Sequence, residues 1–361
     1  MSNKLRPLFD KLYVYTEGWV NGRKDRKSGI AYAKALGPSP EVREKYACVI
    51  RPYWRQFKVR TPRRFWFDLF ANPSKAFSPK YIPDDLWFAR ILPYYSDTIL
   101  AKAWQDKCIQ NITFPDMRRP KTVVKRVAGV FYDDDLAPLT QDQALERCHG
   151  AGRVIVKPSL GSGGGRGIEF CDVGSMTCQQ VLELFRRHGR NFIIQEKLTQ
   201  HPALARMNPQ SLNTLRIITF LRDGQVHVLS SILRIGGAGS EMDNISQGGF
   251  QCNVGPDGQL TGPAMTHFRG KWEYFDVHPD SGIPFGDITV PGYDKVLRAV
   301  VSHAARMAHF KIIGWDIAVD PDGEPVLVEF NALPGQNQES DGPTFGDMTD
   351  AVLEEVFGRR K

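Results

Sequence analysis

One segment of the chain, VIVKPSLGSGGGRGIEF (residues 154–170), combines a lysine with five closely spaced glycines. Lys157 ends a short β-branched run. The glycine-rich backbone that follows can approach a ligand closely and point N–H groups at phosphate oxygens. Because strands are predicted on both sides of the loop, it differs from a Walker A loop and from a dinucleotide fingerprint, which each open a helix. A flexible glycine hairpin with an unrelated lysine is the alternative interpretation.

A second segment, GWDIAVDPDGEPVLVEFNALPG (residues 314–335), brings carboxylate and amide groups together. The pattern predicts a hairpin with Asp316 on one strand, while Glu329 and Asn331, two residues apart, share a face of the returning strand. Three converging oxygen donors suit Mg²⁺, which takes few protein ligands and keeps other positions for water and phosphate. The alternative, a charged rim on an ordinary hairpin, explains less well why polar residues interrupt VLVEFNAL on one face.

Between these two segments lie Asn213, Arg216 and Arg234. The arginines fall on the two strands of a predicted hairpin, residues 214–221 and 225–235, where a guanidinium can bind phosphate oxygens in a bidentate manner. Such groups offset the charge that gathers during phosphoryl transfer. Each arginine alone would be an ordinary ion-pair partner, but the nearby glycine loop and carboxylates favour the functional role. For Asp243-Asn244, a polar loop and a substrate contact are equally consistent.

The elements that must position these residues change in character along the chain. Residues 1–106 read as irregular and helical, are broken by prolines, and include a helix predicted over residues 96–108. From residue 151 onward, short strands and turn signals alternate with helices but without a regular βαβ rhythm. We therefore expect antiparallel-rich α+β lobes with a cleft between them. The remaining predicted strands cover 153–157, 167–171, 191–198, 250–254, 317–319 and 326–330, and the helices cover 175–188 and 293–309.

The composition is that of a globular chain that can fold without disulfide cross-links. The 361 residues are 42% hydrophobic, and the six cysteines are scattered without a CxxC pair, which indicates reduced thiols. Charged residues run through the first thirty positions and no apolar stretch reaches about 18 residues, so we expect neither a signal peptide nor a transmembrane segment, and a cytoplasmic location.

The net charge of +7 favours anionic partners. The excess is concentrated in residues 51–64 (RPYWRQFKVRTPRR) and 118–126 (RRPKTVVKR). A solvated basic face is one interpretation, and a site for an anionic substrate or a lipid surface is the other.

The order of these motifs resembles the ATP-grasp superfamily over residues 96–335. Asp106-Lys107, the stretch HPALARMNPQSLNTLRIITF (residues 201–220) and RIGG (residues 234–237) are similar to the sugar-transfer-associated ATP-grasp branch, near the RimK-like carboxylate-amine ligases. The resemblance implies an α+β ATP-grasp fold, with two lobes gripping ATP after a helix-rich N-terminal region. The implied parts are residues 1–106, a small lobe with the glycine loop at 107–198, and a large lobe with the metal site at 199–361. The usual βαβ pattern of the preceding domain is missing.

The resemblance also implies roles for individual residues. Arg216, Arg234 and Lys157 would act in catalysis, and Asp316, Glu329 and Asn331 would bind metal. The nucleotide would be held by two lysines, the loop, the linker between the lobes and a polar neighbour: Lys107, Lys157, Ser159, Gly161, Ser162, Gly163, Gly164, Gly165, Gln195, Glu196, Lys197, Leu198 and Asn213.

The implied activity is an ATP-dependent carboxylate-amine ligase that works through an acyl-phosphate, in cell-surface polysaccharide or peptide natural-product biosynthesis. ATP and Mg²⁺ are the expected cofactors, with two ions in the site and Mn²⁺ as an alternative metal. The expected partners are a small carboxylate and an amine, without a specific nucleic acid, and a homodimer is left open. A kinase on the same scaffold and a nucleotide-binding module without turnover are the alternatives.

Overall fold

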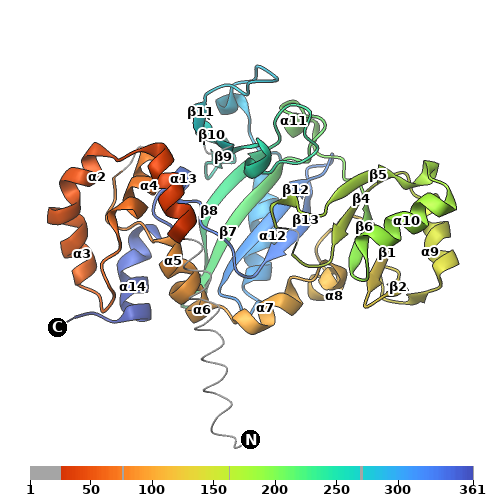
Figure 1. Cartoon of the computed structure of the whole chain (residues 1–361), viewed down its shortest axis with the longest axis horizontal. Coiled ribbons are helices and arrows are strands. Elements are labelled where there is room, and N and C mark those ends of the chain that lie inside the picture. Colours follow the sequence, from red (N-terminus) through yellow and green to blue (C-terminus); the bar gives the residue numbers. More distant parts are fainter. Residues whose placement is uncertain (1–25, 75–76, 162, 269–270, 361) are drawn as a thin grey trace, which may run out of the picture.

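Two antiparallel sheets and a group of short helices form the part of the chain that the computed structural model describes (Figure 1). The described residues are 26–74, 77–161, 163–268 and 271–360. The predicted α+β class is confirmed. The stretch from which the absence of a signal peptide was predicted falls mostly on residues 1–25, outside the described residues, as does Ser162.

The first sheet has six strands in the order β3-β2-β1-β6-β4-β5. Two helices, α9 (Gln141–His149) and α10 (Cys178–His188), cover one of its faces, and each begins with a capping box that satisfies the first backbone N–H groups. Side chains such as Val154, Ile194 and Leu184 form the core between helices and sheet. The strands are β1 (Thr122–Val127), β2 (Val130–Tyr132), β3 (Pro138–Leu139), β4 (Arg153–Pro158), β5 (Glu169–Asp172) and β6 (Phe192–Glu196).

The second sheet has seven strands in the order β11-β10-β9-β8-β7-β12-β13. Helix α12 (Tyr293–Ala304) packs on one face, where Leu215 and Ile217 of β7 join the main hydrophobic core. Because side chains alternate along a strand, Thr214, Arg216 and Ile218 point to the opposite face. The strands are β7 (Thr214–Arg222), β8 (Gln225–Ile235), β9 (Phe250–Val254), β10 (Leu260–Phe268), β11 (Lys271–Phe275), β12 (Ile312–Val319) and β13 (Pro325–Asn331).

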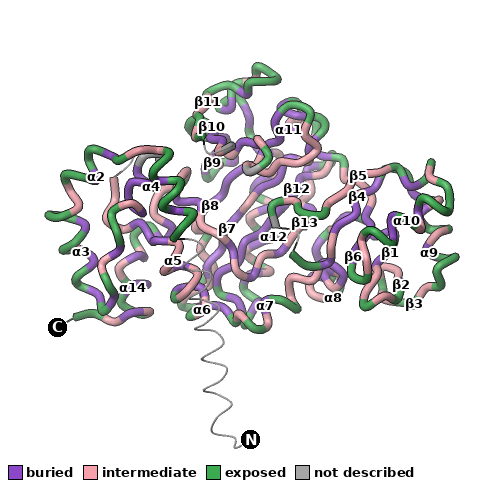
Figure 2. Tube along the Cα trace, viewed as in Figure 1, coloured by how far each residue is buried: buried purple, intermediate pink, exposed green. Residues whose placement is uncertain are grey.

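The N-terminal helices and the C-terminal α13 (Gln338–Asp341) and α14 (Thr349–Phe357) pack on part of that opposite face. Their shared core buries Trp54 and Trp87 together with Phe220 of β7, and Figure 2 shows the buried interior of this group. The indole N–H of Trp87 donates to the Pro334 carbonyl (2.8 Å). The helices are α2 (Pro40–Lys45), α3 (Arg51–Arg55), α4 (Arg64–Ser74), α5 (Asp84–Leu86), α6 (Leu92–Tyr95), α7 (Thr98–Trp104), α8 (Gln110–Thr113) and α11 (Pro202–Ala205). None of the helices in the described ranges is both long and apolar enough to cross a membrane.

The predicted strands of residues 153–157, 214–221 and 225–235 are confirmed within a residue or two. The single helix predicted over residues 96–108 is wrong. It ends at Trp104, because Asp106 adopts an extended conformation and its carboxylate accepts from the Cys108 N–H to start a separate turn.

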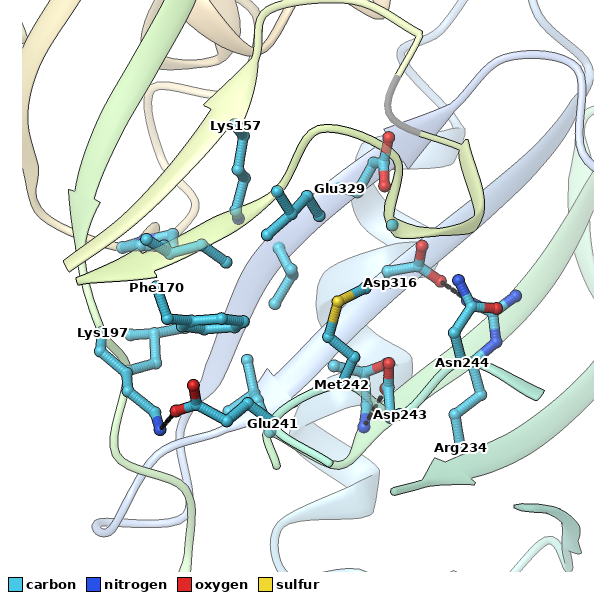
Figure 3. Close-up of a pocket in the computed structure, with 18 of the residues that line it drawn as sticks. Lys157, Phe170, Lys197, Arg234, Glu241, Met242, Asp243, Asn244, Asp316 and Glu329 are labelled. Carbon is cyan, nitrogen blue, oxygen red and sulfur yellow. Dashed lines mark hydrogen bonds and ion pairs between the residues drawn. The ribbon is translucent and has the colours of Figure 1, made fainter. Parts of the chain in front are cut away.

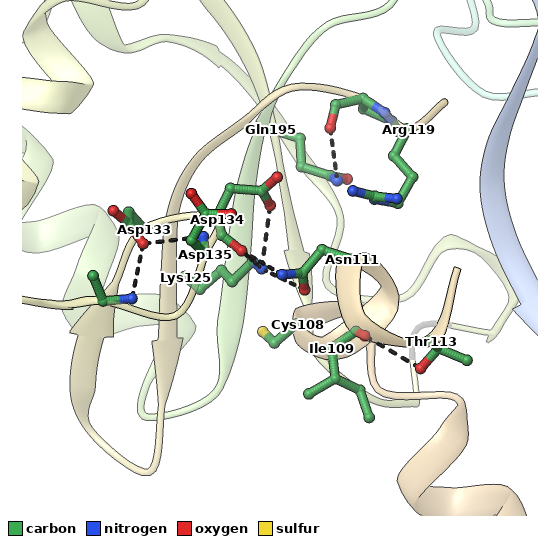
Figure 4. Close-up of polar contacts among 12 residues, drawn as sticks. Cys108, Ile109, Asn111, Thr113, Arg119, Lys125, Asp133, Asp134, Asp135 and Gln195 are labelled. Atoms are coloured by element: carbon green, nitrogen blue, oxygen red, sulfur yellow. Dashed lines mark hydrogen bonds and ion pairs between the residues drawn. The ribbon is translucent and has the colours of Figure 1, made fainter. Parts of the chain in front are cut away.

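A buried lysine fixes the segment after α7 to the six-stranded sheet (Figure 4). Lys125 of β1 is 1% exposed and donates to Asn111 Oδ1 (2.9 Å) and to the Asp134 carbonyl (2.7 Å). Its ammonium also lies 3.2 Å from the Asp134 carboxylate. The Lys107 N–H donates to the Ser159 carbonyl (3.0 Å), so the whole segment belongs to this sheet.

We expect Lys125→Met to lower the free energy of unfolding by about 2 kcal/mol. The methionine keeps the apolar stem but leaves Asn111 Oδ1 without the Lys125 donor and a half-exposed carboxylate without its cation, while the Asp134 carbonyl keeps the Asn111 amide (2.6 Å) as its donor. Urea unfolding at neutral pH measures the change. The control is Lys121→Met, because Lys121 is 77% exposed and its loss should change stability by less than about 0.5 kcal/mol. Equal stability of the two variants would contradict this role for Lys125.

Candidate functional site

Charged side chains form a row across four neighbouring strands of the seven-stranded sheet. Asp316 of β12 lies directly opposite Arg216 of β7 on one side and Glu329 of β13 on the other. Arg234 of β8 lies opposite Thr214, two residues from Arg216. Because opposed residues of antiparallel strands point to the same face, all of these side chains share one face.

A β-bulge in β13 interrupts this pairing next to the acidic residues. Asp316 pairs with Glu329 and Ile317 pairs with Leu327, so Val328 is the extra residue. Bulges redirect side chains and are common beside functional sites. Val328 and Glu329 accordingly both line the same cavity, which strict alternation along a strand would prevent.

The buried carboxylate of Asp316 is held by two arginines. Arg216 binds it through both Nε (2.5 Å to Oδ1) and Nη2 (2.8 Å to Oδ2), and Arg234 Nη1 lies 3.4 Å from Oδ1. The amide nitrogen of Asn331 donates to Oδ2 (3.3 Å). Burial opposes ionisation, but the two guanidinium groups and the amide outweigh it and hold the Asp316 pKa at about 2.

Two lysines face these carboxylates: Lys157 of β4 and Lys107, in the turn that is hydrogen-bonded to Ser159 just after β4. Lys107 Nζ lies 2.9 Å from Glu329 Oε1, so this ion pair connects the two sheets. Lys157 stands near the end of β4 and is 5% exposed. Burial lowers the pKa of the Lys157 ammonium to about 8, and the charge of Lys107 acts in the same direction against the carboxylates of Glu329 and Asp316.

A cavity of about 350 Å³ lies between the sheets and has two chemically different ends (Figure 3). One end carries the row of charges. The other is formed by apolar side chains, beside which Lys197 lies 2.8 Å from Glu241 and 5.4 Å from the ring centre of Phe170. A flat apolar slot next to a charged end fits a ligand with a planar base and an anionic tail. The apolar lining is Pro120, Ile155, Ile168, Phe170, Leu198, Leu212, Met242 and Val328.

The loop between β8 and β9 closes this cavity against the glycine loop. A Cβ at Gly165 would lie 1.9 Å from Met242 Cε, so the two loops are in close contact, and the φ of +78° at Gly165 favours glycine. The Gln247 side chain also donates to the Gly164 carbonyl (3.1 Å). Residues 241–244 therefore line the cavity. Among them, only Asp243 and Asn244 were considered as substrate contacts from the sequence.

Asp243 is buried beside the row of charges. Its carboxylate accepts from the Thr214 N–H (3.1 Å) and from the Thr214 hydroxyl. Burial raises the Asp243 pKa to about 6 against the opposing effect of Arg234 and of the Thr214 hydroxyl. Asp243 thus holds the start of β7 and faces the same cavity.

The structure brings together most of the residues singled out from the sequence. The cavity lining includes Lys107, Lys157, Gly164, Gly165, Glu196, Lys197, Leu198, Arg216, Arg234, Asp316, Glu329 and Asn331. The lining does not include Ser159, Gly161, Gly163, Gln195 and Asn213.

Three of these exceptions have clear structural reasons. Ser159 is buried and its N–H donates to the Asn191 carbonyl (3.2 Å), while the Gln195 amide lies 3.4 Å from the Pro120 carbonyl. Asn213 needs a correction: it is fully buried, and its Oδ1 accepts from Ser211 Oγ (2.7 Å) and the Gly236 N–H (3.2 Å). Its side chain therefore joins the loops around β7 and β8 instead of facing a ligand.

The residues predicted to bind metal fit a hard divalent cation. Asp316, Glu329 and Asn331 offer only oxygen donors, and because Asn331 Nδ2 points at Asp316, its Oδ1 is left for a cation. The described ranges hold no cluster of three or more His, Cys, Asp or Glu residues that could bind a metal, so protein donors here are few. A site with few protein ligands suits Mg²⁺ that arrives with phosphate oxygens.

Residues 105–340 match the model of a protein family described as sugar-transfer associated ATP-grasp. The chain belongs to this family. The predicted ATP-grasp fold is therefore confirmed, with the cavity between the two sheets of that fold. No curated protein matches the chain.

Several solved structures are similar to the chain at low identity. The ATP-grasp ligase PsnB, complexed with minimal precursor, Mg and ADP, is 16% identical over 73% of this chain, with a TM-score of 0.39; this chain spans 62% of PsnB, less than two thirds of its length. VanG D-Ala:D-Ser ligase from Enterococcus faecalis is 13% identical over 75% of this chain and 62% of its own (TM-score 0.41). D-alanine–D-alanine ligase from Bacillus anthracis is 15% identical over 73% and 69% (TM-score 0.40). No TM-score among these three reaches 0.5, so the family match alone supports the fold assignment.

We expect Mg-ATP affinity to be constant just below pH 8 and to fall above it. Lys157 must be protonated to contact a phosphate, its pKa in the free protein is about 8, and a bound phosphate would raise that pKa. Binding then takes up a proton, so affinity should fall by up to roughly tenfold per pH unit above the free pKa.

Calorimetric titrations from about pH 7.5 to 9.5 measure this dependence. Lys157→Arg is the matched variant, because a guanidinium stays charged over this whole range and should flatten the profile. The same decline in both proteins would show that another group is responsible.

Proposed function

We propose that this chain is an ATP-dependent ligase that joins a carboxylate to an amine, with ATP and Mg²⁺ bound in the cavity between the sheets. The observation that carries the proposal is the set of facing charges: Lys107 and Lys157 from one sheet against Glu329 and Asp316 of the other. Cations and oxygen donors meet there at one end of a cavity whose other end is apolar.

The apolar slot around Ile155 and Phe170 would hold the adenine ring, with the backbone of residues 196–198 at its edge. Lys107, Lys157 and the N–H groups of the glycine loop would hold the phosphates. Asp316, Glu329 and Asn331 would hold the metal, which when bound offsets phosphate charge. In exchange, Lys107 is released from Glu329 toward a phosphate oxygen.

The proposed reaction has two steps and needs no nucleophile from the protein. A substrate carboxylate oxygen attacks the γ-phosphorus, the bond to the β-phosphate oxygen breaks, and ADP and an acyl-phosphate form. The amine nitrogen then attacks the acyl carbon, loses a proton and expels phosphate. Arg216 and Arg234 would offset the negative charge that develops, and Lys157 would act with them; their position at the charged end of the cavity supports these roles. The family description associates this fold with sugar transfer, and the role we propose is in cell-surface polysaccharide or peptide natural-product assembly.

A panel of carboxylates and amines with ATP and Mg²⁺, followed by ADP release and product mass, tests this function. ADP release that requires both an acid and an amine, with an amide in the product, is the expected result. A phosphorylated product formed without amine would instead identify a kinase. Absence of ADP release across the panel, with ATP bound, would leave only nucleotide binding.

We expect Lys157→Ala and Glu329→Gln each to reduce ATP turnover by at least about 100-fold, because each removes a charge that faces the phosphates or the metal. Circular dichroism spectra should match the unmodified protein. Arg298→Ala is the control. This exposed residue pairs with Asp294 on α12 (2.8 Å) and is not in the lining of the cavity, so its loss should leave turnover unchanged. Normal turnover in either site variant would count against the assignment.

A further inference from the structure

The first 64 residues contain more than the whole net positive charge of the chain. They hold sixteen Lys and Arg against five Asp and Glu, so the remainder of the sequence is net negative. At α3, at the turn into α4 and at the adjoining C-terminal segment, six exposed cations form no ion pair within the described residues. Arg64 and Arg359 lie beside them and pair with Asp68 (3.3 Å) and Glu354 (3.6 Å). We name this surface the basic end, and its residues are Arg51, Arg55, Lys58, Arg60, Arg63 and Arg360.

The basic end is a fixed part of the fold. The Lys58 N–H donates to the Gly358 carbonyl (2.8 Å) and the Arg360 N–H donates to the Gln56 carbonyl (2.8 Å), which ties the two chain segments together. Beneath them Trp54 and Phe57 are fully buried. In Figure 1, α3 and the C-terminus lie at the end of the molecule opposite α9 and α10, and Figure 2 shows α3 largely exposed.

Several exposed arginines elsewhere have a carboxylate partner, and the six cations of the basic end have none within the described residues. Within the described ranges, none of the six forms an ion pair, whereas Arg186, Arg298 and Arg306 pair with Glu183 (2.8 Å), Asp294 (2.8 Å) and Asp116 (3.4 Å). Like charges held together on a rigid surface repel one another. An external layer of negative charge relieves that repulsion and is attracted over several ångströms.

We propose that the basic end docks the protein on a bilayer that contains anionic phospholipids. Lipid headgroups require only cations presented together on the surface, which this end provides. A single-stranded nucleic acid would also need open aromatic faces for its bases, but Trp54 and Phe57 at this end are fully buried. No residue of the basic end lines the nucleotide cavity, so docking is independent of the proposed ligase activity.

Vesicle flotation with the full chain tests the proposal. The vesicles are phosphatidylcholine alone or with about 30 mol% phosphatidylglycerol, in about 0.05 M or 0.5 M NaCl. We expect binding only to the anionic vesicles at low salt. The triple variant R55Q/R60Q/R63Q should bind roughly 100-fold more weakly, which is about fivefold for each lost charge. R186Q/R298Q/R306Q loses the same net charge elsewhere and should bind as the unmodified chain does.

Three results would overturn the proposal: no binding to anionic vesicles at low salt, equal loss of binding in the two triple variants, or displacement from the vesicles by a single-stranded oligonucleotide at a lower phosphate concentration than the lipid presents. Thermal unfolding of both variants confirms that they are folded. If R55Q/R60Q/R63Q unfolds, the three single variants replace it. Each should bind the anionic vesicles about fivefold more weakly, and an unchanged affinity in any of them would count against the proposal.

Discussion

The buried charges between the two sheets require partners, and these pairings govern how the strands and the cavity are arranged. A carboxylate inside a protein must meet cations or polar donors, because ionisation away from water is otherwise prohibitive. Asp316 meets this requirement through Arg216 on the neighbouring strand and Arg234 one strand further on. The partly exposed Glu329 pairs with Lys107, in the turn that is bound to the other sheet. The strand order β8-β7-β12-β13 and its register thus carry the charge balance, and the Lys107–Glu329 pair links the two sheets.

The same pairs explain why the cavity suits a magnesium nucleotide. Each protein cation now bound to a carboxylate is a group that could instead bind phosphate, and each carboxylate is a group that could instead bind metal. A magnesium nucleotide brings negative phosphates for the protein cations and a positive metal ion for the carboxylates. Its binding can therefore replace the existing ion pairs without leaving a charge unpaired. The glycine loop and the loop of Met242 touch across the opening, which limits the water that weakens such interactions.

How much of this could be read from the sequence depended on how local each signal was. Asp316, Glu329 and the two arginines were predictable, because strand alternation and a short turn fix which residues share a face. The inward position of Asn213 was not, since it depends on partners at Leu204 and Gly236 that only the folded chain brings close. Strand β1 was not predicted. A lysine in its sequence suggests an exposed position, and only the folded chain shows that Lys125 is buried against Asn111 and Asp134. The sequence of the N-terminal third did not predict how its helices pack. Their hydrophobic core includes residues distant in the sequence, such as Phe220.

A crystal structure of the chain with Mg²⁺ and a non-hydrolysable ATP analogue would show directly whether the nucleotide binds between the sheets. We expect the base beside Phe170, the triphosphate between the glycine loop and Glu329, and Lys107 Nζ moved from Glu329 to a phosphate oxygen. A nucleotide bound outside this cavity, or inside it with the Lys107–Glu329 pair intact and no cation near Asp316 and Asn331, would contradict it.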